Sequence, residues 1–226
     1  MKTIEISDFN DLLATFSKLD LCYYRGVSKS EYELIPKFGR RKYPGGTTLE
    51  EHILKMFKER ALPYISKTPM NLWEWIALAQ HHGLPTRLLD WSHSPLVATF
   101  FAVEKDYPTD CAIFCLPIIV TENIDTEKEI TPFKVDKLYF FHPPHVSARI
   151  TSQAAVFTIH PKPEEPFVSD VLIKIIIPKN MRNTIKDDLN GFAINKSSLF
   201  PGLDGVAEYL DYTLSTFLYT TNTMIK

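Results

Sequence analysis

The sequence predicts a single α+β domain in which a helical N-terminal half packs on a mainly antiparallel β second half. Three observations support this fold class. Residues 8–105 are dominated by helical spacing of apolar residues and by helix caps, whereas short β-branched and aromatic runs dominate after Asp110. The chain has no internal repeat and no low-complexity linker. We therefore expect residues 1–226 to form one integrated domain.

Four helices are expected in the N-terminal half, within residues 8–19, 48–65, 71–82 and 94–105. Each begins at a residue whose side chain can accept a hydrogen bond from the first helical turn. The predicted caps are Asp8, Thr48 with Glu51 at capping-box spacing, Asn71, and Ser94 followed by Pro95. Gly83 provides a left-handed stop for the third helix. The segment LCYYRGV, residues 21–27, reads as a strand.

Four strands are expected in the second half, in the segments CAIFCLPIIV, KLYFFH, AAVFTI and VLIKIIIP. Two helices follow, in KNMRNTIKDDLNG and FPGLDGVAEYLDYTLSTF. In a strand, Cys111 and Cys115 share one face, and we interpret them as small core residues. The odd number of cysteines, three, does not indicate a disulfide framework.

Composition excludes several classes of function. Lys plus Arg total 25 against 27 Asp plus Glu, so the net charge of −2 disfavours generic nucleic-acid binding. The longest apolar run is too short to cross a bilayer, and the first residues lack a signal-peptide pattern. We expect a cytoplasmic protein without membrane contact. Dinucleotide-binding glycine loops, phosphate-binding loops and the serine-hydrolase elbow have no matching motif.

The segment LAQHHGLPTRLLDW, residues 78–91, concentrates polar groups in an apolar stretch. His81 and His82 diverge by about 100° on a helix, so at most one of them can face a given partner, and we expect no metal site. Arg87 and Asp90 are interpreted as a buried pair that braces the junction between two helices. One histidine could serve as a donor or base in a cleft, or as a satisfied core group.

Three other clusters have both a functional and a structural interpretation. Arg25, next to Gly26, could clamp a phosphate or pair across the sheet with an acid. Ser152 and Gln153, expected at the start of a strand, could bind a ligand or cap unpaired backbone groups. The acids Asp204 and Glu208 follow a Gly-Leu-Asp-Gly turn, where the first could cap the next helix.

Taken together, these clusters resemble the FRG domain, a family named for a Phe-or-Tyr, Arg, Gly triplet. The triplet here is Tyr24, Arg25 and Gly26. The resemblance extends through AQHHGLPTRLLDWSHSPLVATFFA, ITSQAAVFTIHP and LFPGLDGVAEYL, so the core of the domain is expected at about residues 20–210. The family occurs mostly in bacteria and phages.

A fainter resemblance links the order of these motifs to arginine-class ADP-ribosyltransferases, which have a Tyr-Arg-Gly strand, a serine-bearing strand start and a late catalytic acid. This resemblance implies an ADP-ribosyltransferase-like fold with NAD as substrate. It implies catalytic roles for Asp204, Gln153 and Glu208. The residues that it implies for ligand binding are Tyr24, Arg25, Gly26, Ser152, His81 and His82.

The resulting hypothesis is a cleft that binds a nucleotide-like small molecule, with ADP-ribosyltransferase or NAD glycohydrolase activity in a toxin or phage-defence context. A protein acceptor would be a second partner. The alternative is a noncatalytic module that uses the same cleft to recognise a nucleotide or a protein.

Overall fold

A seven-stranded, mostly antiparallel sheet forms the centre of the described chain, with strand order β1-β7-β4-β2-β3-β6-β5. The computed structural model describes residues 1–41, 43–120, 122–128, 131–143 and 148–224. Among the paired strands, β1 and β7 run parallel and the other neighbours run antiparallel. The strands are β1 (Lys2–Glu5), β2 (Cys22–Val27), β3 (Leu88–Ser92), β4 (Cys111–Pro117), β5 (Tyr139–Phe141), β6 (Ala155–Ile159) and β7 (Ile173–Ile177).

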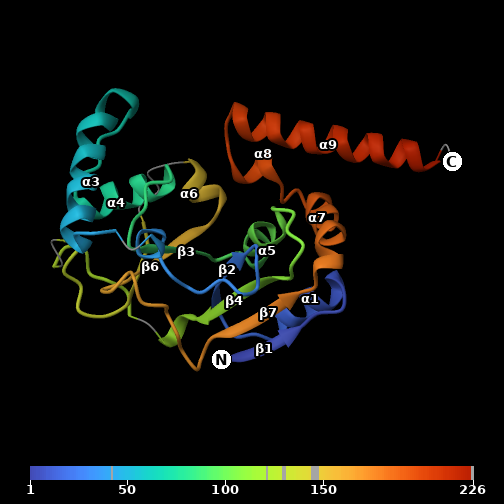
Figure 1. The fold of residues 1–226 in the computed structure, drawn as a ribbon, viewed down its shortest axis with the longest axis horizontal. Coiled ribbons are helices and arrows are strands. Elements are labelled where there is room, and N and C mark those ends of the chain that lie inside the picture. The colour runs from blue at the N-terminus through green and yellow to red at the C-terminus, as the bar shows by residue number, and fades with distance from the viewer. Residues whose placement is uncertain (42, 121, 129–130, 144–147, 225–226) are drawn as a thin grey trace.

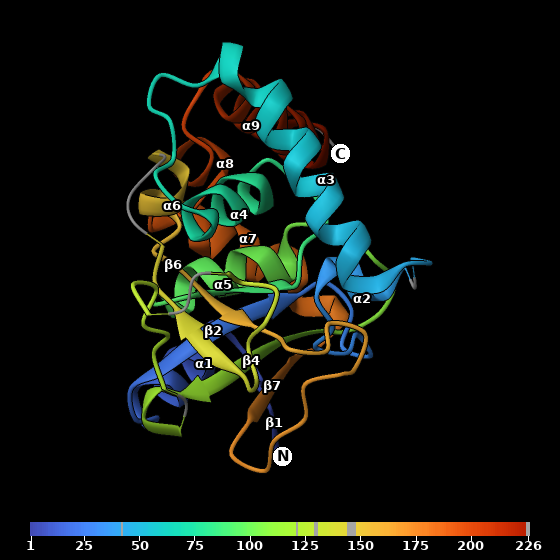
Figure 2. The same ribbon diagram turned by 90° about the vertical axis from the view of Figure 1, so that its left-hand side faces the viewer.

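Helices surround this sheet, as Figures 1 and 2 show. The α-helices are α1 (Phe9–Ser17), α2 (Lys37–Arg40), α3 (Gly46–Ala61), α4 (Leu72–His81), α5 (Pro95–Val103), α6 (Ala148–Ser152), α7 (Arg182–Gly191), α8 (Lys196–Leu199) and α9 (Leu203–Met224). Short 3-10 turns occupy Leu62–Tyr64, Ile118–Val120 and Lys179–Met181. None of the helices in the described ranges combines the length and the apolar character that a membrane span requires.

The predicted mixture of helices and a mainly antiparallel sheet is confirmed, but the predicted division into two halves is wrong. Strands β1, β2 and β3 all come from the N-terminal half and lie in the same sheet as the later strands. The segment that forms β3 was expected to be part of the junction between two helices. Its residues Leu88, Leu89 and Trp91 are nearly inaccessible to solvent, because this strand is covered on both faces and therefore lacks alternating polarity.

Three of the four predicted helix caps are confirmed. Asp8 and Ser94 accept hydrogen bonds from the first turns of α1 and α5, and the Asn71 side chain accepts one from the backbone of Glu74. The cap at Thr48 is wrong, because α3 begins at Gly46 and has no side-chain cap. The stop after α4 is confirmed, since Gly83 has a φ of 85°.

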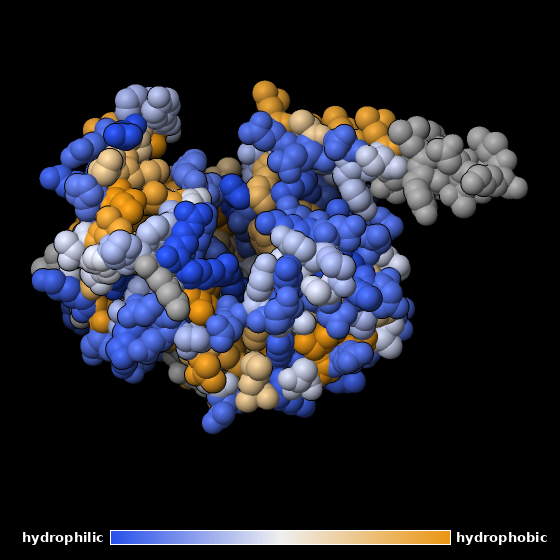
Figure 3. Space-filling model, in the orientation of Figure 1, coloured by the Kyte–Doolittle hydropathy of each residue, from blue (hydrophilic) through white to orange (hydrophobic). Residues whose placement is uncertain are grey.

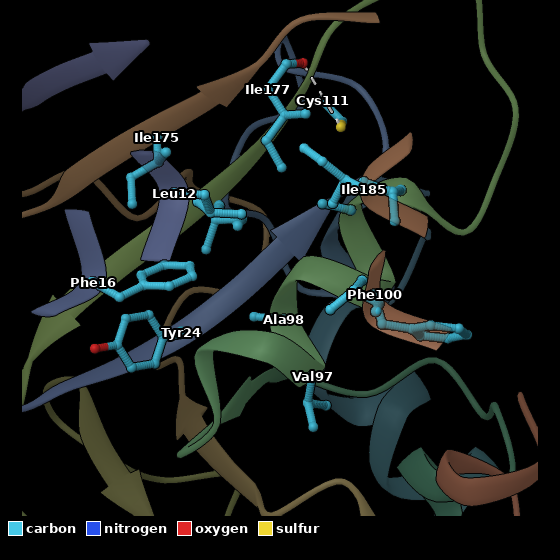
Figure 4. Packing of buried hydrophobic residues seen from close by; sticks show 14 of the residues in the cluster. Leu12, Phe16, Tyr24, Val97, Ala98, Phe100, Cys111, Ile175, Ile177 and Ile185 are labelled. Atoms are coloured by element: carbon cyan, nitrogen blue, oxygen red, sulfur yellow. Dashed lines mark hydrogen bonds between the residues drawn. The ribbon is translucent and has the colours of Figure 1, made fainter. Parts of the chain in front are cut away.

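The main apolar core lies between the sheet and helices α1, α5 and α7 (Figure 4). Cys111 and Cys115 are fully buried in this core, as predicted. Helix α5 approaches β2 so closely that a Cβ atom on Gly26 would lie 1.9 Å from the carbonyl oxygen of Ala98. The glycine of the Tyr-Arg-Gly triplet is therefore required by backbone packing.

The sheet is nearly divided between its two central strands. In the described chain β2 and β3 pair only through Tyr24 and Ser92. By contrast, β2 pairs with β4 along its whole length, and β3 pairs with β6 along its whole length. Beyond Tyr24 the two central strands therefore diverge, and side chains must fill the opening.

Candidate functional site

A cavity of about 970 Å³ lies where β2 and β3 diverge. Its walls come from both strands, from the ends of α4 and α5, from α6 and from residues 28–40 (Figure 1). The volume is near the upper end of the range for ligand pockets, which is about 300–1,000 Å³. This opening is the candidate functional site.

Arg25 bridges the opening between the two central strands. Its Nη1 donates a hydrogen bond to the backbone carbonyl of Asp90 at 2.6 Å and lies 3.4 Å from the carboxylate oxygen Oδ2. The Arg25 side chain is 14% exposed, and that of Asp90 is 54% exposed. Of the two interpretations of Arg25, pairing across the sheet is the one observed. Within the described chain neither Nε nor Nη2 of Arg25 makes a hydrogen bond, and because Nε is buried, Nη2 is the donor left for a ligand.

Asp90 is held by a short chain of hydrogen bonds. Gln80 Nε2 donates to Asp90 Oδ1 at 2.9 Å, and Thr86 Oγ1 donates to Gln80 Oε1 at 2.7 Å. These contacts orient the carboxylate toward Arg25 and leave part of it exposed to the cavity. Neither Gln80 nor Asp90 was among the predicted ligand-binding residues. The available signal was the position of Gln80 one residue before the histidine pair.

Arg87 is a buried brace, as predicted, but its predicted partner is wrong. Its Nε lies 2.9 Å from Glu50 Oε2, and its backbone N–H donates to Glu50 Oε1 at 2.6 Å. Nη1 and Nη2 donate to the Phe133 carbonyl and to Thr47 Oγ1. Asp90 cannot serve here because side chains three positions apart in an extended segment point to opposite faces, and the Asp90 carboxylate contacts Arg25 and Gln80 instead. Burial raises the pKa of the Glu50 carboxyl, and Arg87 opposes that shift.

One of the two adjacent histidines faces the cavity. His81 is half-buried and lines it, whereas His82 is exposed and does not. Burial lowers the pKa of His81 to about 4, and the positive charges of Arg149 and His82 add to that effect. The His81 imidazole is therefore neutral near pH 7 and can act as a donor or an acceptor.

The segment around α6 contributes a cation and an amide to the cavity. The Arg149 guanidinium stacks 4.1 Å from the centre of the Phe200 ring and has no ion pair within the described chain. Gln153 also lines the cavity, and its Nε2 donates to the Leu199 carbonyl at 3.0 Å. Ser152 does not line it, because its hydroxyl contacts the carbonyls of Arg149 and Leu199. Ser152 ends helix α6, and strand β6 follows at Ala155, so these residues precede a strand as predicted.

The two late acids lie outside the cavity, contrary to the expectation that Asp204 faces the same cleft as Arg25. Asp204 is exposed in the first turn of α9. Glu208 lines a separate cavity of about 270 Å³ and forms an ion pair with Lys196 at 3.1 Å. The reason is that α9 packs against α8 and α7 instead of the central strands.

Tyr24 and Gly26 border the cavity mainly through the backbone of β2. The Tyr24 side chain is 7% exposed and packs edge-on against Phe16, 5.5 Å between ring centres, in the core drawn in Figure 4. Gly26 accommodates α5, as described above. These two residues therefore position Arg25 and offer no side chain to a ligand.

The cavity carries charges of both signs. The basic residues that line it are Arg25, Lys37, Arg40, Lys105 and Arg149. The acidic residues are Glu31, Glu33, Asp90 and Glu104. Aromatic rings also line it, among them Phe101, Tyr32 and Tyr107. Across the described residues, no group of three or more histidine, cysteine or acidic side chains is arranged to hold a metal ion.

Comparison with known proteins gives one match. Residues 20–111 match the family model of the FRG domain. The matched range includes Arg25, Gln80, His81 and Asp90, and it stops before Arg149 and Gln153. No curated protein and no solved structure gave a significant match.

Proposed function

The chain carries an FRG domain over residues 20–111, and on that premise we propose that the cavity beside Arg25 binds a nucleotide-like ligand, with NAD as the first ligand to test. The observation that carries the proposal is the pair of arginines, Arg25 and Arg149, which line one cavity and retain guanidinium donors without carboxylate partners. Arginine forks match the geometry of phosphate oxygens.

The two arginines differ in how freely they can move to a ligand. Within the described chain the Arg149 guanidinium stacks on Phe200 and forms no ion pair with a carboxylate, although Asp90 and Glu104 lie near enough to influence it. Arg25 is fixed by the Asp90 carbonyl and offers its Nη2. Burial lowers the pKa of both guanidinium groups, and Asp90 opposes this in both cases. Both remain charged near neutral pH. In this arrangement Arg25 is a rigid contact and Arg149 an adaptable one.

The remaining cavity groups suit the other parts of a nucleotide. Aromatic rings such as Phe101 and Tyr107 can stack on a base. The carboxylate of Asp90 and the amide of Gln153 can accept and donate hydrogen bonds to ribose hydroxyls and to a carboxamide. An anionic ligand would also raise the pKa of His81, which lies near Arg149.

Within this proposal Asp90 takes the catalytic role that the resemblance to ADP-ribosyltransferases implied for a late acid. In NAD hydrolysis the bond between ribose and nicotinamide breaks, the bonding electrons leave with nicotinamide, and water adds to the ribose carbon and releases one proton to solvent. A carboxylate beside the ribose stabilises the positive charge that develops there. Asp90 is the carboxylate next to Arg25, and in a transferase an acceptor protein would replace water.

A noncatalytic ligand-binding module is the second candidate, and one observation favours it. Asp90 already accepts a hydrogen bond from Gln80 and contacts Arg25, and the acids Asp204 and Glu208 lie outside the cavity. A carboxylate committed to its neighbours can hold a ligand without activating it. In that case NAD or a related nucleotide would bind and remain intact.

The test combines binding with turnover. Isothermal titration should show NAD binding by the wild-type chain, and Arg149→Gln should weaken it about 10- to 100-fold because a charge-assisted contact is lost. Arg60→Gln, which changes an exposed arginine on α3, is the matched control and should leave affinity unchanged. Chromatography can measure whether nicotinamide is released, with Asp90→Asn as the inactive control. Release by the wild type supports an enzyme, whereas binding without release supports a noncatalytic module. A folded wild-type chain that binds neither NAD nor other nucleotides would overturn the proposal.

A further inference from the structure

An apolar stripe along α9 is exposed to solvent. Its members in the described part of the helix are separated by three or four positions, so they share one helical face. We call this face the α9 stripe; it consists of Leu203, Val206, Leu210 and Leu214, which are 88%, 43%, 53% and 62% exposed. Figure 3 shows hydrophobic side chains along the outer edge of α9, on the side away from the body of the molecule.

The other side of α9 is attached to the domain. Tyr212 donates a hydrogen bond to Asp187 on α7, and the Lys186 ammonium lies 4.2 Å from the centre of the Tyr212 ring. Glu208 pairs with Lys196 on α8 at 3.1 Å. These contacts fix the rotation of the helix about its axis. The α9 stripe therefore points outward as a result of folding, and unfolding is not needed to expose it.

The exposed charges beside the α9 stripe are negative. Residues 203–215 contain no lysine or arginine, and the carboxylates of Asp204 and Asp211 are exposed, whereas Glu208 on the attached side pairs with Lys196. Two α9 helices packed on each other would bring like charges together, which disfavours that arrangement. The surface that fits the stripe is apolar and flanked by bases.

Such a surface is present at the C-terminal end of α3 and in the residues that follow. We call it the α3 tip, and its exposed apolar side chains are Met56, Leu62, Tyr64 and Met70, which are 37%, 53%, 87% and 80% exposed. Residues 55–67 carry four bases, which are Lys55, Lys58, Arg60 and Lys67. Their one acid is Glu59. The α3 tip is thus apolar and basic where the α9 stripe is apolar and acidic.

We propose that two copies of the chain associate by reciprocal packing of the α9 stripe of each copy on the α3 tip of the other. Figures 1 and 2 place α3 and α9 at the same end of the molecule, and Figure 3 shows a hollow between their two sides. A twofold axis at that end brings each stripe onto the partner's tip, so both contacts form at once and the assembly closes as a dimer. Burial of large apolar side chains supplies affinity, and opposite charges select the pairing.

Sedimentation velocity of the full chain over a range of concentrations tests the association. The wild type should form a dimer whose dissociation constant rises with salt. Leu210→Glu combined with Leu214→Glu should raise that constant about 100-fold or more, because two apolar contacts are replaced by charges. Val168→Glu, at a residue 80% exposed outside both surfaces, is the matched control and should leave the dimer intact. Circular dichroism melting checks that each variant is folded.

Charge exchange identifies the partner surface. Asp204→Lys with Asp211→Lys should weaken the dimer, and so should Lys58→Glu with Arg60→Glu, whereas the four changes together in one chain should restore it. A wild type that stays monomeric at every concentration overturns the proposal. A dimer that responds to the α9 changes and ignores the α3 changes also overturns it, since α9 would then pack on another surface. Neither result bears on ligand binding in the cavity beside Arg25, which titration measures separately.

Discussion

The pair of Arg87 with Glu50 and the pair of Arg25 with Asp90 join the same chemical groups in two different environments. In the first pair, 1% of the arginine side chain and 3% of the glutamate side chain are exposed, and Nε, Nη1 and Nη2 of the arginine all have partners. In the second pair, the exposed fractions are 14% and 54%, and the arginine keeps an unused Nη2. The satisfied pair can only brace the fold, whereas the partly satisfied pair can also receive a ligand.

The largest expected effect comes from breaking the buried pair. Glu50→Ala and Arg87→Ala should each lower the free energy of unfolding by about 3–5 kcal/mol, because each leaves the other group charged and buried without an opposite charge beside it. The double variant should lose much less than the sum of the two. Urea denaturation of the four chains measures this coupling. Lys179→Ala, at an exposed position outside the α9 stripe and the α3 tip, is the control, and it should change stability by less than about 0.5 kcal/mol.

A loss of only a few tenths of a kcal/mol in both single variants would contradict the brace. The two arginine pairs would then have similar roles, and their difference in burial would not change how much each contributes to the free energy of unfolding.

The next largest expected effect is on the pH dependence of stability. It comes from His160, whose pKa is lowered by the arginines of both pairs. His160 is 3% exposed and hydrogen-bonded to Thr158. Burial lowers its pKa from 6.5 to about 3, and Arg25 and Arg87 both add to the shift. Between pH 6.5 and 3, the unfolded chain therefore binds a proton at His160, whereas His160 in the folded chain stays neutral. Stability should fall as the pH falls from 6.5 toward 3, with a contribution from this residue of about 1.4 kcal/mol per pH unit.

Denaturation at a series of pH values in that window measures the slope. His160→Gln should flatten it by the stated amount. An unaltered slope in His160→Gln would mean that His160 is not the group that takes up the proton.

The smallest expected effect on stability belongs to the pair at the cavity. Asp90→Asn should change the free energy of unfolding by less than about 1 kcal/mol, because the carboxylate is half-exposed and solvent screens its attraction to Arg25. The asparagine oxygen can still accept from Gln80. Thermal denaturation of Asp90→Asn and of Glu50→Ala under the same conditions ranks the two pairs by their contribution to stability. A loss as large as that of Glu50→Ala would show that Asp90 is a second brace and would remove the distinction between the pairs.

Local features of the sequence predicted those elements whose cause is local. The caps at Asp8, Asn71 and Ser94 each involve a partner three positions away, and the stop at Gly83 depends on one residue's backbone. The cap at Thr48 was predicted by the same rule and is wrong, because the neighbouring Thr47 side chain accepts a hydrogen bond from Arg87 and α3 begins earlier. A tertiary contact here overrides a local preference.

Strand β3 and the candidate site were harder to predict because their causes are distant in sequence. The LLDWS segment becomes a strand because β6 pairs with it along its whole length, and its buried faces hide the alternation by which strands are detected. Gln153 and Arg149 join Arg25 only through the packing of α6 beside the opening in the sheet. Asp204 was assigned to the same cleft from motif order, and order along the chain does not specify distance in space.

By itself, the sequence determined the match of residues 20–111 to the FRG domain, the buried and structural character of Arg87, and the fact that only one of two adjacent histidines could face a cleft. These follow from motif content and from the geometry of a single helix. The tertiary structure decided which acid serves which arginine, since Glu50 lies 37 positions from Arg87 and Asp90 lies 65 positions from Arg25. Such pairings depend on how helices and strands pack, because a carboxylate stabilises whichever cation the fold brings within a few ångströms.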